Sequence, residues 1–172
     1  LAANAGMTLS RTVGQESTML TVTAKDAPLT LVLGDRHRIT VAAGSTVRVA
    51  VPLRYIDRFV AVAVDSGSAT VGSQALSAGS QPVYVAGAAV IPNADASALM
   101  AAVQAESSAF AQSQLPGLTD EQRTALLEAQ RLGAQAIVAA VTDAGVLEHK
   151  PLLPFVPGDR LFATPLSPSG TP

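Results

Sequence analysis

The densest cluster of side chains that could do chemistry is Asp35-Arg36-His37-Arg38. A carboxylate that orients an imidazole is the arrangement of a general base for acyl transfer, and neighbouring arginines can hold an anion. Because successive side chains on a strand point to opposite faces, Asp35 and His37 would share one face and the two arginines the other. A hairpin turn with solvated charges explains the same four residues, and we favour that interpretation.

A second charged group, Arg54, Asp57 and Arg58, follows Pro52. Pro52 ends the preceding strand or places it at a sheet edge. If the segment is a helical turn, Arg54 and Arg58 lie at i and i+4 on one side and could bind a phosphate or a neighbouring chain. A surface salt bridge is the simpler interpretation, and such a bridge contributes little to stability.

No motif for a metal or a nucleotide occurs in the sequence. His149 lies beside Glu148, but the chain has no cysteine and only two histidines, whereas a metal site normally needs three or four ligands. The nucleophile elbow G-x-S-x-G, the phosphate loop and the dinucleotide fingerprint are also missing. We therefore expect no catalytic residue, no cofactor and no metal. An enzyme with a dispersed site is the alternative, and it would draw on four residues: Asp35, His37, Asp57 or Asp65.

The composition is that of a globular protein with few charges. Hydrophobic residues make up 48% of the chain and charged residues 14%, where about 25% charged is usual. Either Ala, Ser and Gly simply replace charged residues, or neighbouring molecules cover part of the surface. The net charge of −2 gives no general field for nucleic acid. No apolar run reaches the roughly 18 residues of a membrane span, so we expect neither nucleic acid nor membrane as a partner.

Residues 1–90 predict short strands separated by turns. The clearest strand is 46–51, where three valines point one way and Thr46, Arg48 and Ala50 the other. Further strands are expected at 7–13, 18–23, 29–33, 38–41, 59–64 and 82–86, with a stub at 69–71 and a loop at 72–81. Strands that recur about every 8–12 residues favour an antiparallel sandwich or barrel.

The hydrophobic period changes after Pro92, and residues 93–148 predict a helical hairpin. Asn93 or Asp95 can cap the first helix, Thr119 and Gln122 form a capping box for the second, and Gly145 is expected to end it. The expected apolar positions are Leu99, Met100, Val103 and Phe110 in the first helix, and Leu126, Leu127, Ala134, Ile137, Val138 and Val141 in the second. Four small residues of the second helix either permit close helix approach or reflect only high helix propensity: Ala129, Gly133, Ala136 and Ala140.

Residues 149–172 predict a Pro-rich extended arm, which we call the arm. Six prolines forbid a regular helix and favour extended backbone: Pro151, Pro154, Pro157, Pro165, Pro168 and Pro172. Between them lie seven apolar side chains that a merely solvated tail would not need: Leu152, Leu153, Phe155, Val156, Leu161, Phe162 and Leu166. We expect these seven residues to bind a surface, either of the same chain or of a partner. A loose chain end is the alternative.

The sequence therefore predicts an α+β protein. An N-terminal antiparallel β-sandwich or barrel (1–90) is followed by an α-hairpin (93–148), packed on it or on a neighbour, and by an extended C-terminal arm (149–172).

The function that this organisation favours is that of a non-enzymatic structural subunit that self-associates, as a homo-oligomer and with other structural subunits. Its most concrete form is a particle component of a bacterial virus (capsid, connector or tail), which would place the chain in the virion. The alternative is a secreted or periplasmic β-sandwich module that binds a ligand with its loops, especially 65–81.

Overall fold

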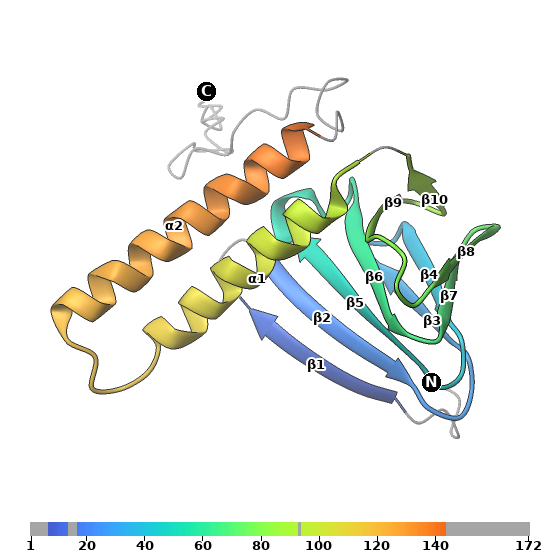
Figure 1. The fold of residues 1–172 in the computed structure, drawn as a ribbon, viewed down its shortest axis with the longest axis horizontal. Helices are drawn as coiled ribbons and strands as arrows, with labels where there is room; N and C mark the ends of the chain where they lie inside the picture. Colours follow the sequence, from blue (N-terminus) through green and yellow to red (C-terminus); the bar gives the residue numbers. More distant parts are fainter. Residues whose placement is uncertain (1–6, 14–16, 93, 144–172) are drawn as a thin grey trace, which may run out of the picture.

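The computed structural model describes residues 7–13, 17–92 and 94–143, and side chains from residue 17 onward. The N-terminal part forms two antiparallel sheets, and two helices follow it (Figure 1). This arrangement confirms the predicted α+β class with a sandwich-like β part.

The first sheet has six strands in the order β1 (Met7–Val13), β2 (Ser17–Ala24), β5 (Ser45–Pro52), β6 (Val60–Ser66), β9 (Val83–Ala86) and β10 (Ala89–Ile91). The second has four strands in the order β3 (Leu29–Leu33), β4 (His37–Val41), β7 (Ser68–Val71) and β8 (Gln74–Ser77). A short 3-10 turn, η1 (Leu53–Tyr55), lies between β5 and β6, and the helices are α1 (Ala96–Ser113) and α2 (Asp120–Asp143).

Valine side chains form the core between the two sheets. In β5, Val47 and Val49 are fully buried and pack in one cluster with Ile39 and Val41 of the second sheet. The register pairs Val47 with Val22 of β2 on one side and with Val64 of β6 on the other. The strict alternation of 46–51 therefore delivers a continuous apolar face, and each valine buried in this way stabilises the fold by about 1.5–3 kcal/mol.

The opposite face of the six-stranded sheet packs against α1. Ala50, Ala61 and Ala63 lie on this face, and their small side chains let the helix come close to the sheet. The helix contributes Leu99, Met100 and Val103 to the same cluster. Phe59 and Tyr84 complete it with an edge-to-face ring contact, their centroids 5.2 Å apart. The six-stranded sheet is thus covered on both faces.

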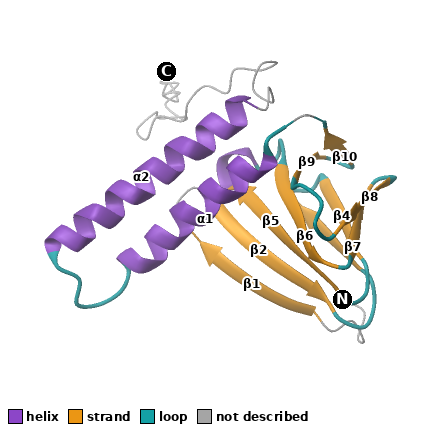
Figure 2. Ribbon diagram, in the orientation of Figure 1, coloured by secondary structure: helices purple, strands orange, loops and turns teal. Residues whose placement is uncertain are grey.

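Helix α2 forms the outermost layer and packs mainly against α1 (Figure 2). Gly133 explains the close approach of the two helices, because a Cβ built there would lie 2.8 Å from Cβ of Glu106 in α1. Of the four small residues, Gly133 and Ala140 are buried whereas Ala129 and Ala136 are exposed. Close approach therefore accounts for two of the four.

The helix caps follow the predicted local rules. Asp95 accepts a hydrogen bond from the backbone N–H of Ala98 at 3.1 Å, so Asp95 is the N-cap of α1. Thr119 and Gln122 exchange side-chain to backbone hydrogen bonds of 2.9 and 3.2 Å, which confirms the capping box before α2. Asn93 and the expected stop at Gly145 lie outside the described residues.

Two short strands differ from the prediction. The segment 72–81 was expected to be a loop, but Gln74–Ser77 forms β8 and pairs with β7 through a turn at Gly72 and Ser73. Gly72 has φ of 57°, and a Cβ there would lie 2.3 Å from the carbonyl oxygen of Ala88, so the turn needs glycine. β10, which the sequence pattern did not indicate, pairs with β9 at the sheet edge. Both segments form strands because they pair with a neighbouring strand, and not because of their local strand propensity.

Candidate functional site

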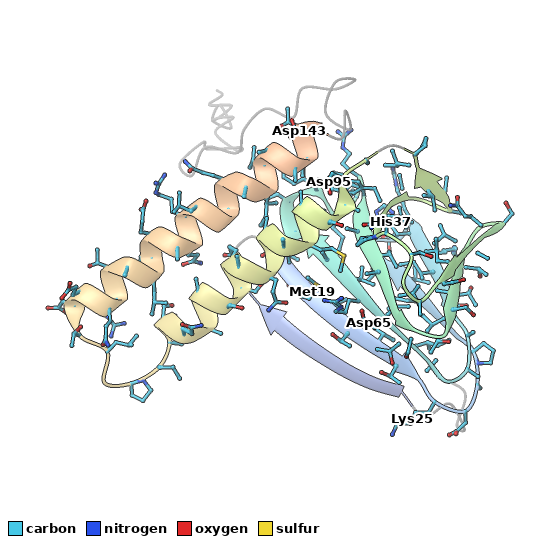
Figure 3. All side chains as sticks on the ribbon, viewed as in Figure 1. Met19, Lys25, His37, Asp65, Asp95 and Asp143 are labelled. Atoms are coloured by element: carbon cyan, nitrogen blue, oxygen red, sulfur yellow. The ribbon has the colours of Figure 1, made fainter. Side chains whose placement is uncertain are left out.

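His37, the first candidate base, is a buried structural histidine. Its side chain is fully buried at the start of β4, in the β part of Figure 3. Nδ1 accepts a hydrogen bond from the N–H of Gly87 at 2.9 Å, and Nε2 lies 2.5 Å from the carbonyl oxygen of Ile56. In these contacts Nε2 faces an acceptor and Nδ1 faces a donor, so the two ring nitrogens have complementary roles. Both ring nitrogens contact backbone groups, so the imidazole joins the segments that contain Gly87 and Ile56.

The other charged candidates lie at the surface. Asp35 is exposed in the turn between β3 and β4, with φ of 58°, and it does not share a buried face with His37. The hairpin turn that we favoured is confirmed, although His37 is buried rather than solvated. Arg54 is exposed in η1, and Asp57 is exposed and Arg58 half-buried in the turn after it. The charged side chains lie in the β3–β4 turn and in the β5–β6 connection, and they do not form one site with His37.

A buried polar cluster around Glu106 escaped the sequence prediction. Glu106 is fully buried between α1, α2 and the start of β2. The Ser17 hydroxyl donates to its Oε2 at 2.5 Å, and the Gln130 amide donates to its Oε1 at 3.1 Å. Ser107 adds a hydroxyl 3.4 Å from that of Ser17. The cluster joins three elements through one carboxyl group, so its described bonds are structural.

The sequence did hold a signal for this cluster. Glu106 follows Leu99 and Val103 by seven and three positions, which places it on the same stripe of α1. A charged residue on a buried stripe requires hydrogen-bond partners in the interior.

Tyr84 links the sheet to α2. Its hydroxyl donates to the backbone carbonyl of Ala140 at 3.2 Å, and its side chain is fully buried. Burial raises the pKa of the phenol to about 12, and the carboxylates of Asp95 and Asp143 add to the shift. Figure 3 shows these two aspartates at the same end of the helix pair. The hydroxyl is therefore kept protonated as a donor in the interior.

The outer face of α2 is the name that we give to Leu127, Arg131, Ala134, Gln135 and Val138, which are exposed except for the half-buried Ala134. Leu127 and Val138, two residues of the predicted apolar face of this helix, are 54% and 42% exposed. Ile137 and Val141 are buried as expected, on the stripe that faces α1. α2 carries two adjacent apolar stripes, and α1 covers one of them.

A shallow hollow of about 310 Å³ lies on this outer face, lined by Arg131, Ala134, Gln135 and Val138. Arg131 is turned onto Glu128, to which its guanidinium donates hydrogen bonds of 2.8 and 2.6 Å. These bonds lower the pKa of the Glu128 carboxyl. The pairing holds the guanidinium against Glu128, and both side chains stay 54% exposed.

A second hollow of about 270 Å³ lies beside α1 on the six-stranded sheet. Met19 and Met100 line it, together with Arg48 and Gln104. The Arg48 guanidinium donates to Asp65 at 2.8 Å, and Figure 3 places Asp65 on the part of the sheet beyond the helix. This hollow therefore has two methionine side chains and the guanidinium of Arg48, which is paired with Asp65.

The remaining sequence candidates lie outside the described residues: His149 and the seven apolar residues of the arm. Within the described ranges, no group of three or more His, Asp or Glu side chains is placed to hold a metal ion. Neither helix of the described chain is long and apolar enough to cross a membrane.

Comparison of the chain with protein-family models, with curated proteins and with solved structures gave no match.

Proposed function

We propose that the chain is a non-enzymatic structural subunit that associates with copies of itself and with other structural subunits. The observation that carries the proposal is the outer face of α2, which no other described element covers and where Leu127 and Val138 are exposed beside a hollow. Exposed large apolar side chains that gather on one helix face are a feature of protein interaction sites. Among the described elements, this face lies on the outermost layer of the fold.

The polar side chains of the interior support a structural role. His37 uses both ring nitrogens on backbone groups, and the described bonds of Glu106 join α1, α2 and β2. A general base must reach the proton that it abstracts, and a nucleophile must reach an open site. The described hydrogen bonds of His37 and Glu106, the side chains best suited to catalysis, instead stabilise the fold.

The most concrete version of the proposal is a capsid, connector or tail component of a bacterial virus. It is supported by the low charge content, by helices rich in Ala and by the apolar arm, all of which suit subunits that pack closely in a particle. An arm that orders on assembly can cover a large surface on a neighbour.

Sedimentation velocity over a concentration series tests the self-association. The full chain, whose monomer has a mass of 17.4 kDa, is expected to sediment as a multi-subunit species. A chain truncated after Glu148 is expected to sediment as a monomer. Circular dichroism of the truncated chain verifies that it remains folded. Monomers in both samples at every concentration would refute the proposal.

The hollow beside α1 favours a second candidate, a sandwich-type module that binds a small ligand. Arg48 would hold a polar or anionic group while Met19 and Met100 contact an apolar part. The loop segment 65–81, which was expected to hold a ligand, contributes instead the β7–β8 hairpin. A thermal-shift screen of small carboxylates with wild type and Arg48→Ala tests this candidate, which needs a stabilising compound whose effect disappears in the variant.

A further inference from the structure

We propose that the outer face of α2 is the docking site for the arm of a second copy of this chain. The inference rests on the proposed function and deepens it, because it names the two surfaces through which the copies associate.

The outer face carries a shallow hollow, which we call the groove. Leu127, Arg131, Ala134 and Val138 are spaced at i, i+4, i+7 and i+11, so they form one stripe along the helix. The hollow between the last three is about 310 Å³, which is at the lower end of the roughly 300–1,000 Å³ of ligand pockets. Arg131 is held by Glu128 and both side chains stay 54% exposed, so an apolar side chain would enter beside a paired charge.

The arm has the complementary chemistry. Its seven apolar residues lie between prolines that favour the extended polyproline conformation. Extended Pro-rich segments bind apolar grooves at low entropic cost because their backbone is already restricted. The arm therefore offers apolar side chains on a stiff backbone, and the groove offers an open apolar wall.

The lengths of the two partners also agree. Residues 152–166 of the arm span about 46 Å at roughly 3.1 Å per residue. The 24 residues of α2 span about 36 Å at roughly 1.5 Å per residue. One arm can thus follow the whole outer face of one helix.

The length of the arm allows a second copy to supply it. Val138 lies about 8 Å of helix rise from Asp143, the end of the described helix. If extended, the nine residues 144–152 would span up to about 28 Å from that end. An arm of this reach can enter the groove of a neighbouring copy, and the low charge content of the chain, 14%, fits a surface that such a neighbour covers. Each copy then supplies one groove and one arm, which is a heterologous contact that builds rings or filaments.

Thiol cross-linking tests this placement directly, because the chain has no cysteine of its own. Full-length chains with Ala134→Cys are mixed with full-length, size-tagged chains that carry Phe155→Cys, and disulfide formation is followed on non-reducing gels. Ala136→Cys is the matched control, since Ala136 is an exposed alanine of the same helix two positions away. The expected yield of the mixed dimer is at least tenfold higher for position 134 than for position 136.

Equal yields at positions 134 and 136 would overturn the proposal. So would a link that forms only within one chain when both cysteines are placed on it, because the arm would then cover its own helix. Sedimentation of the same samples separates the two claims. Assembly without a preference for position 134 overturns the docking site and leaves self-association standing, whereas a monomer at all concentrations overturns both.

Charge substitution gives a second readout on the full chain. Ala134→Glu places a carboxylate in the hollow and is expected to weaken assembly at least tenfold, while Ala136→Glu changes it less than twofold. Thermal unfolding shows whether both variants keep the fold. Equal effects of the two substitutions would contradict the docking site.

Discussion

Raising the pH above 10 should destabilise the protein through Tyr84. The phenol has a pKa of about 12 in the fold against 10.0 as its ordinary value. Below pH 10 it is protonated in both the folded and the unfolded chain, so its contribution to stability is complete. Between pH 10 and pH 12 the unfolded chain loses the proton while the fold retains it. Stability then falls as the pH rises, by at most about 1.4 kcal/mol per pH unit.

Urea unfolding at pH 8 and pH 11, followed by circular dichroism, measures this loss. Wild type is expected to lose about 1 kcal/mol more than Tyr84→Phe between the two pH values, because the variant has no phenol to ionise. At pH 8 the same variant is expected to be less stable by about 1 kcal/mol, the usual contribution of one hydrogen bond. The bond lost is the one to the carbonyl of Ala140.

Tyr55→Phe is the matched control, since it removes the other phenol of the chain and leaves the Tyr84 contact in place. The alkaline loss should persist in this control. If Tyr84→Phe loses as much stability at pH 11 as wild type does, burial of the Tyr84 phenol is not the cause and the reasoning fails.

Two further substitutions test the packing of the fold in urea unfolding at neutral pH. Gly133→Leu should lower the free energy of unfolding by about 2–3 kcal/mol, because its side chain enters the contact with Glu106. Ala136→Leu on the exposed side should change this free energy by less than about 0.5 kcal/mol. Equal losses in the two variants would contradict the contact. His37→Phe should cost about 2–4 kcal/mol, because a buried N–H and a buried carbonyl lose their partner. Asp35→Asn in the adjacent exposed turn is its control, and a loss below about 0.5 kcal/mol in His37→Phe would refute the structural role of that histidine.

Elements with strong local signals could be predicted from the sequence. The alternation of 46–51 defines both faces of β5, because a period of two leaves each side chain only one possible face. The capping box at Thr119 and the cap at Asp95 depend on contacts within one helical turn, so a few residues specify them.

Features that depend on distant contacts could not be predicted. β8 has weak strand propensity and exists through its pairing with β7. The pattern of α2 shows that Leu127 and Val138 are on an apolar stripe, but periodicity does not reveal which stripe the neighbouring helix covers. The bonds of Glu106 join residues 24 and 89 positions apart, so its spacing on α1 indicates burial and not its partners.

Competition by the isolated arm tests the central claim, that copies of the chain associate through the arm. A synthetic peptide of residues 149–172 is added in excess to the assembled full chain, and the molar mass is followed by light scattering, with a peptide of the same composition in scrambled order as control. The account predicts that the arm peptide lowers the molar mass towards that of the 17.4 kDa monomer and that the scrambled peptide does not. An assembly whose molar mass is unchanged by saturating arm peptide would contradict it.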